Sequence, residues 1–304
     1  MSKISVVINT LNEEKNLPLA IASVKGFADE IVVVDMESSD RTVEVAKRLG
    51  AKVFSHKKVG YVEPARNYAV SKAKGNYVFI LDADEEVSPG LVKKIKKIVH
   101  PPGHPRGGRV DSSGGSAVAD YYRIPRKNII FGKWIKHSRW WPDYNIRFFK
   151  KGFVSWDEVI HSIPMTKGKG TDLPEKEEYA IIHNNYSSIE GYLERMSRYS
   201  QVESGEMMKG GYVFSWKDLI NKPSNEFLSR FFAGEGYKDG IHGLALALLQ
   251  AFSQLVLYLK VWQKQGFDQK ELPKKEIKSE LVKALKDIKW WVKKKLTLFG
   301  FLLR

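Results

Sequence analysis

Acidic and amide side chains follow three apolar runs of this 304-residue sequence, each at the point where the run ends. The three polar stretches are Asn9–Glu14, Asp35–Thr42 and Asp82–Glu86. In the third, Asp82 and Asp84 alternate, so a chain that leaves a strand there can turn both carboxylates toward one cation. Mg²⁺ and Mn²⁺ are commonly held by one or two carboxylates, with phosphate oxygens and water as the remaining ligands. The spacing therefore predicts a divalent-metal site, for Mg²⁺ or Mn²⁺, that would neutralise a diphosphate.

Each stretch also has a purely structural interpretation. Ser38, Ser39 or Asp40 can cap a following helix. The acids after Asn12 suit the positive end of a helix dipole, and Asp82–Glu86 can be a solvated turn. Capping alone does not readily account for so many acidic and amide groups at successive strand ends.

The period of the apolar residues predicts the elements that position these groups. Buried strands are expected at Ile4–Ile8, Glu30–Asp35, Lys52–Ser55 and Asn76–Leu81, and helices at Glu13–Gly26, Arg41–Leu49, Val62–Lys74 and Pro89–Val99. Continuously apolar strands that alternate with helices predict an α/β fold, a mostly parallel sheet with helices on both faces. In such sheets ligands bind beyond the carboxyl ends of the strands, where the polar stretches lie.

The second half of the sequence changes character. Residues 100–119 are rich in Gly, Pro and Ser, which predicts a mobile loop. Strands are expected at Tyr121–Pro125 and Ile146–Phe149, with Ala180–His183 a weaker case, and helices at Ile189–Met208, Glu226–Phe232, Ile241–Gln265 and Lys275–Leu298. We therefore expect a catalytic domain over 1–185 and a helical region over 186–304.

The formal net charge of +15 resides in two segments. Residues 121–151 carry nine Lys or Arg and only Asp143 as an acid, and the tail 274–304 carries ten basic and three acidic residues. The tail is amphipathic, with apolar residues at three- and four-residue steps: Ile277, Leu281, Leu285, Ile288, Val292, Leu296 and Phe299. A basic amphipathic helix with Trp favours an anionic membrane surface, and the alternative is a helix docked on the catalytic domain. Leu244–Trp262 is apolar, but its polar interruptions argue against a clean transmembrane span.

Several protein classes are excluded by what the sequence lacks. It has no cysteine, which excludes a disulfide scaffold, a thiolate zinc site and a cysteine nucleophile. It has no Walker-type loop and no Gly-x-Gly-x-x-Gly after the first strand, which argues against a P-loop NTPase and a dinucleotide enzyme. The start shows no secretory signal pattern, and no standard nucleic-acid motif is present, so no nucleic-acid partner is expected.

The ordered set Asn-Thr-Leu-Asn-Glu-Glu, Val-Val-Asp-x-x-Ser-Ser-Asp-x-Thr, Ala-Arg-Asn and Leu-Asp-Ala-Asp-Glu resembles glycosyltransferase family 2 over residues 3–100. Trp141–Lys150 and Phe227–Gly243 resemble its bacterial lipopolysaccharide-core glucosyltransferases. The resemblance implies a GT-A, Rossmann-like fold and inverting hexosyl transfer from a nucleotide-diphosphate sugar, with a UDP-sugar expected. Two positions depart from the family, since Asn9 replaces a frequent proline and Met36 a frequent second acid.

The resemblance also implies roles for individual residues. Thr10, Leu11 and Glu13 would line the nucleoside pocket, Asp35 would bind the base, Arg66 would lie near the nucleotide, Asp82 and Ala83 would contact the nucleotide sugar, and Asp82 and Asp84 would hold the metal. Inverting transfer needs a base for the acceptor hydroxyl. Asp143 is the first candidate, because an acid followed four residues later by Arg matches the family's layout. Asp157, Glu158 and His161 are the alternatives.

Together these patterns predict a metal-dependent inverting glycosyltransferase, peripheral on the cytoplasmic face of the cell membrane. Its acceptor would be a lipid-linked or cell-envelope glycan, as in lipopolysaccharide biosynthesis. Trp134, Trp140 and Trp141 would form a sugar platform or pack in the core. One alternative is a polyprenyl-phosphate sugar synthase. Alternatives from other classes are a basic nucleic-acid-binding protein and a membrane scaffold.

Overall fold

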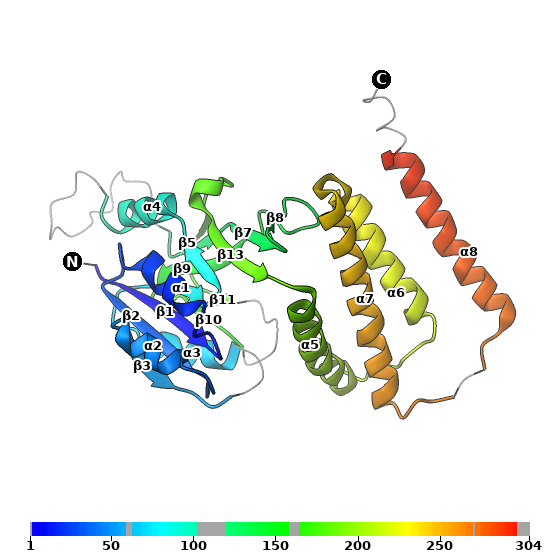
Figure 1. Ribbon diagram of the computed structural model, residues 1–304, viewed down its shortest axis with the longest axis horizontal. Coiled ribbons are helices and arrows are strands. Elements are labelled where there is room, and N and C mark those ends of the chain that lie inside the picture. The colour runs from blue at the N-terminus through cyan, green and yellow to red at the C-terminus, as the bar shows by residue number, and fades with distance from the viewer. Residues whose placement is uncertain (1, 59–62, 102–118, 158–163, 270, 297–304) are drawn as a thin grey trace, which may run out of the picture. The chain divides into compact units, whose positions relative to one another are not determined.

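A computed structural model describes residues 2–58, 63–101, 119–157, 164–269 and 271–296 of the chain (Figure 1). The chain forms two compact units. Unit 1 comprises residues 1–129 and 142–185, and unit 2 comprises residues 130–141 and 186–304. The segment 130–141, which the sequence grouped with the catalytic domain, thus packs with the helices. The predicted loop at 100–119 falls almost entirely outside the described residues.

Unit 1 is built on a seven-stranded sheet in the order β12-β6-β9-β4-β1-β2-β3. Its strands are β1 (Ile4–Thr10), β2 (Glu30–Asp35), β3 (Lys52–Ser55), β4 (Tyr77–Asp82), β6 (Tyr121–Ile124), β9 (Asn145–Lys150) and β12 (Gly170–Asp172). Strands β1 to β4 are mutually parallel, β12 is parallel to β6, and β9 runs antiparallel between β4 and β6. The predicted α/β fold with a mostly parallel sheet of the GT-A kind, followed by a helical region, is confirmed.

Helices cover both faces of this sheet because its central strands are apolar on both sides. Ile4, Val6 and Ile8 of β1 share a core with α1 (Leu17–Val24) and α4 (Pro89–Val99). Val7 points the other way, toward α3 (Glu63–Lys72). The short α2 (Thr42–Arg48) contributes Ala46 to the first core.

A second, four-stranded sheet has the order β5-β13-β7-β8. It consists of β5 (Glu85–Val87), β13 (Ile181–Tyr186), β7 (Arg126–Ile130) and β8 (Lys133–Trp134), of which β8 lies in the segment assigned to unit 2. Unit 1 also contains the short elements β10 (Val154–Ser155), β11 (Met165–Thr166) and the 3-10 turn η1 (Glu177–Tyr179). The four-stranded sheet buries several polar side chains, among them Glu85, Asn128 and His183. Since β5 leaves the end of β4, these polar groups are brought to the rim where Asp82 lies.

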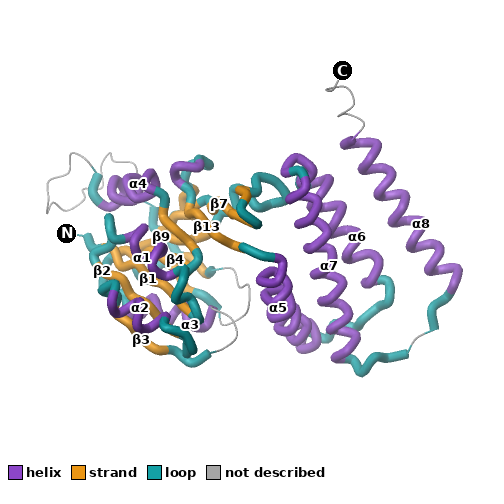
Figure 2. The backbone as a smooth tube through the Cα atoms, viewed as in Figure 1, coloured by secondary structure: helices purple, strands orange, loops and turns teal. Residues whose placement is uncertain are grey.

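Unit 2 is almost wholly helical (Figure 2). It contains α5 (Ile189–Lys209), α6 (Asp218–Leu228), α7 (Ile241–Lys264), α8 (Lys274–Trp291) and the short turns η2 (Ser229–Ala233), η3 (Gly236–Asp239) and η4 (Val292–Leu296). The segment 130–141 joins this unit because Ile130 and Ile135 bury against Leu246 of α7. The buried Asp239 carboxylate also accepts the backbone N–H groups of Lys136 and His137 at 3.3 and 2.9 Å.

Helix α7 is the one helix within the described residues that is long and apolar enough to cross a membrane by length and composition. It packs against α5 and α6. Two of the polar residues that interrupt its apolar sequence, Gln250 and Ser253, hydrogen-bond the Tyr192 hydroxyl of α5 at 2.9 and 2.8 Å.

Glu30 ties together the edge of the sheet opposite the rim. Its carboxylate accepts hydrogen bonds from the Ser5 hydroxyl at 2.5 Å, the Lys74 backbone N–H at 2.5 Å and the Lys52 ammonium at 2.8 Å. Burial raises the pKa of Glu30, but the hydrogen bonds from Lys52, Ser5 and Lys74 outweigh it and lower the pKa to about 2.

A depressed pKa in the folded state means that Glu30 stabilises the fold above its unfolded pKa, and that this contribution disappears as the pH falls from about 4.5 to about 2. We expect Glu30→Gln to lower the free energy of unfolding at pH 7 by about 1–2 kcal/mol. The difference from wild type should shrink toward pH 2. Urea unfolding across this range tests it, with the exposed Glu175→Gln as control; a pH-independent difference would contradict it.

Candidate active site

The carboxyl ends of three neighbouring strands place the predicted polar stretches at one rim. In the strand register, Thr10 of β1 is opposite Asp35 of β2, and Asn9 is opposite Asp82 of β4. The structure thus brings Thr10, Asp35 and Asp82 to one edge, as expected for parallel strands.

Asp35 is buried, and its carboxylate organises the turn after β2. It accepts hydrogen bonds from the Thr10 hydroxyl at 3.2 Å, and from the Ser38 hydroxyl and backbone N–H at 2.5 and 3.0 Å. Asn12 joins the neighbouring turn, because its N–H donates to the Ser38 hydroxyl at 2.8 Å and its side-chain oxygen accepts from the Ser39 N–H at 2.8 Å. Ser38 and Ser39 therefore connect two turns, and neither caps a helix.

The other predicted nucleotide-binding residues lie around these turns. Leu11 and Glu13 are half-buried, and the Glu13 N–H donates to the Thr42 hydroxyl at 2.8 Å. Ala83 is buried beside Asp82. Arg66 of α3 donates to Asp82 Oδ1 at 3.3 Å, so the structure joins these two predicted residues directly.

Arg147 of β9 is almost completely buried at this rim, with 2% of its side chain exposed. Its Nη2 donates to Asp82 Oδ2 at 2.6 Å and to Glu85 Oε1 at 2.7 Å. Burial opposes the charged form of both partners. The charges of Arg147 and Arg66 nevertheless hold the pKa of Asp82 far below its usual range, and the charges of Asp82 and Glu85 raise the pKa of Arg147.

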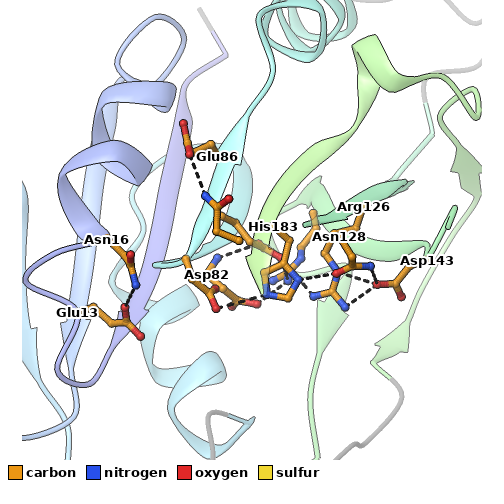
Figure 3. A network of polar contacts seen from close by, with 12 residues as sticks. Glu13, Asn16, Asp82, Glu86, Arg126, Asn128, Asp143 and His183 are labelled. Atoms are coloured by element: carbon orange, nitrogen blue, oxygen red, sulfur yellow. Dashed lines mark hydrogen bonds and ion pairs between the residues drawn. The ribbon is translucent and has the colours of Figure 1, made fainter. Parts of the chain in front are cut away.

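A second arginine extends this pairing toward Asp143. Arg126 of β7 contacts Glu85 Oε1 at 3.3 Å and Asp143 Oδ2 at 2.7 Å. Burial lowers the pKa of Arg126, but the charges of Glu85 and Asp143 outweigh it and raise the pKa. Asn128 also donates to Asp143 Oδ2, at 2.8 Å (Figure 3). Two donors therefore hold one oxygen of Asp143, while Oδ1 accepts no hydrogen bond from any residue that the structure describes.

The backbone before β9 is shaped to present this carboxylate. Asp143 has a φ of 41°, in the left-handed region that Asp and Asn tolerate better than most residues. The Asn145 side chain donates to the Asp143 carbonyl at 2.9 Å, and the Arg126 N–H donates to the Pro142 carbonyl at 2.8 Å. The turn is therefore fixed from both sides.

Asp84 faces His183 of β13, with 3.4 Å between Asp84 Oδ2 and His183 Nε2. The other ring nitrogen of His183, Nδ1, lies 2.7 Å from the side-chain oxygen of Asn128. Because an amide oxygen can only accept, a hydrogen bond between the two atoms requires the hydrogen on Nδ1. Neutral His183 then carries a lone pair on Nε2, directed at a carboxylate. Two electron-pair donors at this distance suit a shared cation. Among the described residues no group of three His, Cys, Asp or Glu side chains is placed to hold a metal ion, so substrate or water oxygens would have to complete the shell.

The remaining candidates are distributed differently. Asp157 is exposed, and Glu158 and His161 lie outside the described residues. The three tryptophans belong to unit 2. Trp134 and Trp141 meet edge to face with ring centres 5.2 Å apart, the Lys136 ammonium lies 4.1 Å from the Trp134 ring centre, and Trp140 packs beside Ile130 and Ile135.

Sequence reasoning missed Asn128 and His183 as site residues. Asn128 lies in the basic segment without a neighbouring motif, and His183 ends a strand with a weak apolar pattern. The available signal was alternation, since every second residue of β13 is buried, His183 and Asn185 included, and Asn128 and Ile130 are buried two positions apart in β7.

Comparison with known proteins gives one family and several relatives. The family model described as glycosyl transferase family 2 matches residues 5–162. An uncharacterized glycosyltransferase of Rickettsia typhi (strain ATCC VR-144 / Wilmington) is 31% identical over 270 residues, covering 86% of this chain and 87% of the relative. An uncharacterized glycosyltransferase of Rickettsia prowazekii (strain Madrid E) is 29% identical over 270 residues, covering 86% and 87%.

Comparison with solved structures gives two further similarities. Staphylococcus aureus TarS 1–349 in complex with UDP covers 90% of this chain and 94% of its own, at 15% identity and a TM-score of 0.45. Glucosyl-3-phosphoglycerate synthase from Mycobacterium tuberculosis, in complex with Mn²⁺, UDP and glucosyl-3-phosphoglycerate, covers 31% and 39%, at 29% identity and a TM-score of 0.26. At these TM-scores neither likeness bears on the ligands of this chain.

The buried pairs of Arg147 generate a stability prediction. We expect Arg147→Met to lower the free energy of unfolding by about 3–5 kcal/mol, because it leaves the buried Glu85 carboxylate without its nearest cation. Arg123→Met is the matched control. Its pair with Asp172 is half exposed and should contribute at most about 1 kcal/mol. Chemical unfolding of both variants measures the difference, and equal losses would show that burial of the Arg147 pairs is unimportant.

Proposed function

The chain belongs to glycosyltransferase family 2, and we propose that it transfers a hexose, with inversion, from a nucleotide-diphosphate sugar to a lipid-linked or cell-envelope glycan. One observation carries the proposal. At one rim lie Asp84 and His183, two side chains that can bind a cation, and the carboxylate of Asp143. One oxygen of Asp143 is held by Arg126 and Asn128, and the other accepts no hydrogen bond from the described residues. Glycosyl transfer needs both, a cation for the departing diphosphate and a base for the attacking hydroxyl.

The donor would bind along the ends of β1, β2 and β4. Thr10, Leu11, Glu13 and Asp35 would receive the nucleoside, with UDP as the expected nucleotide, and Arg66 would approach the phosphates. Because Asp82 is already neutralised by two arginines, its role in this scheme is to hold Arg147 and Arg66 in place beside the diphosphate.

The metal ion, Mg²⁺ or Mn²⁺, would be held by Asp84 and His183, with phosphate oxygens completing its shell. When bound, it supplies positive charge to the departing nucleoside diphosphate. The residues fit this task, because Asp84 Oδ2 and His183 Nε2 face each other as electron-pair donors. In this assignment Asp84 is the metal ligand, and Asp82 supports it through the arginines.

Asp143 would act as the base. Its open Oδ1 takes the proton of the acceptor hydroxyl while that oxygen bonds to the anomeric carbon from the face opposite the diphosphate. The bond between the anomeric carbon and the phosphate oxygen breaks, and its electrons leave with the nucleoside diphosphate. Arg126 and Asn128 fix Oδ2, so the carboxylate keeps its orientation during the step.

The tail would place the enzyme on the inner face of the cell membrane. Helix α8 packs on α6, and its Trp291 stacks on Phe232 of the following turn η2 with ring centres 6.2 Å apart. Part of its apolar stripe nevertheless remains accessible to solvent, because the side chains of Leu281 and Leu285 are 47% and 56% exposed. Exposed lysines accompany them, which supports contact with an anionic lipid surface.

Thermal shift with a panel of nucleotide sugars, with and without Mn²⁺, tests the donor and the metal. We expect UDP-sugars to raise the melting temperature in a Mn²⁺-dependent way. Asp84→Asn should remove the Mn²⁺ dependence and lower turnover at least ~10²-fold. If no nucleotide sugar binds while DNA binds with a steep salt dependence, the nucleic-acid alternative replaces the proposal.

The role of the base predicts a split between turnover and binding. At saturating Mn²⁺, Asp143→Asn should lower kcat at least ~10²-fold and leave the Kd of the nucleotide sugar nearly unchanged, because the base acts on the acceptor. An active Asp143→Asn together with an inactive Glu158→Gln would move the base to Glu158. A polyprenyl-phosphate acceptor, already ionised, would make kcat insensitive to Asp143.

The proposed membrane contact predicts that the protein binds anionic liposomes through the charge of the α8 lysines. Replacement of Lys278, Lys286 and Lys289 by Gln should weaken co-sedimentation with anionic liposomes, since each lysine near such a surface contributes about 1 kcal/mol. Lys93, Lys96 and Lys97 of α4, replaced in the same way, are the control and should have little effect. Equal effects of the two triples, or a full-length protein that ignores anionic liposomes, would contradict the proposed contact.

A further inference from the structure

Asn128 occupies the point where the proposed base and the proposed metal ligands meet. It is completely buried on β7. Its side-chain nitrogen lies 2.8 Å from Asp143 Oδ2 and its side-chain oxygen lies 2.7 Å from His183 Nδ1. Figure 3 shows the amide between the two side chains.

The chemistry of its neighbours fixes which way this amide points. An ionised Asp143 can only accept hydrogen bonds, so the NH₂ group of Asn128 must face it. The side-chain oxygen of Asn128 is then turned toward His183, and an oxygen without hydrogen can only accept. His183 Nδ1 must therefore carry a hydrogen and donate it.

The consequence reaches Asp84. A neutral imidazole with its hydrogen on Nδ1 has a bare lone pair on Nε2. That lone pair faces Asp84 Oδ2 at 3.4 Å. Without the acceptor on Asn128, His183 would gain by moving its hydrogen to Nε2 and donating it to Asp84. The hydrogen on Nε2 would then prevent that nitrogen from binding a metal ion, and the hydrogen bond would engage Asp84 Oδ2.

We propose that Asn128 is a positioning residue that couples the two halves of the reaction, orienting Asp143 with its NH₂ group and holding His183 in the tautomer that leaves Nε2 open. This inference rests on the proposed function for its purpose, but the tautomer is a property of the protein alone. Partners that fix a ligand histidine in this way typically account for about 10–100-fold in metal affinity.

The first experiment uses metal-free protein, full length and labelled with ¹⁵N-histidine. Long-range ¹H–¹⁵N spectra at pH 8 distinguish the two tautomers, and His183→Gln assigns the signal. We expect the hydrogen of His183 on Nδ1 in wild type and on Nε2 in Asn128→Leu. A wild-type His183 that carries a hydrogen on Nε2, or an Asn128→Leu spectrum identical to wild type, overturns the proposal.

The second experiment measures Mn²⁺ affinity in the presence of UDP by the EPR signal of free Mn²⁺. Asn128→Leu should weaken the affinity about 10–100-fold. Asp143→Asn should weaken it as well, although Asp143 is not a proposed metal ligand, because an amide at 143 no longer dictates how Asn128 points. The two effects should not add in the double variant, because both act through the same tautomer.

Arg126→Lys is the matched control. Arg126 also holds Asp143, but it contacts Glu85 and Asp143 rather than His183. We expect it to lower kcat and leave the Mn²⁺ affinity unchanged. If it weakens Mn²⁺ as much as Asn128→Leu does, general disruption replaces the proposal. If Asn128→Leu changes neither the tautomer nor Mn²⁺ affinity while Asp84→Asn still abolishes transfer, the proposed function stands and the coupling fails.

Discussion

One buried cation sets the geometry of the rim. Arg147 arrives on β9, the antiparallel strand between β4 and β6, and its guanidinium is almost completely removed from water. A charge in that position is tolerable only beside anions, and Asp82 and Glu85 supply them on either side of the β4–β5 turn. The turn that carries Asp84 is thereby held at both ends, so Asp84 projects from a fixed support.

From that cation the polar side chains continue as a chain of complementary partners. Glu85 is shared by Arg147 and Arg126, Arg126 and Asn128 share Asp143, and Asn128 reaches His183. Buried networks of this kind are costly unless each member is satisfied. Glu85, Asp143, Asn128 and His183 each have a partner in this network, whereas Nε and Nη1 of Arg147 are buried without a hydrogen-bond partner among the described residues.

Sequence patterns predicted what depends on neighbours in the chain. The apolar runs predicted the parallel strands, and the polar residues that follow them predicted a rim with Asp35, Asp82 and Asp84. The site residues that β7 and β13 supply were not predicted. The contact between Asn128 and His183 depends on strand pairing between residues 55 positions apart in the sequence. Pro223 lies inside α6, although proline usually interrupts a helix, so residues 218–225 were not predicted as helical. Which apolar residues of α8 remain exposed depends on how α8 packs on α6, and the sequence alone does not show that packing.

The path of the chain between its two units has an evolutionary consequence. Because residues 130–141 belong to unit 2 while both flanking segments belong to unit 1, the backbone passes from one unit to the other three times. Residues 186–304 alone would lack Ile130 and Ile135 beneath α7 and the backbone that Asp239 binds. The helical unit is therefore not a cassette that a single recombination event could exchange.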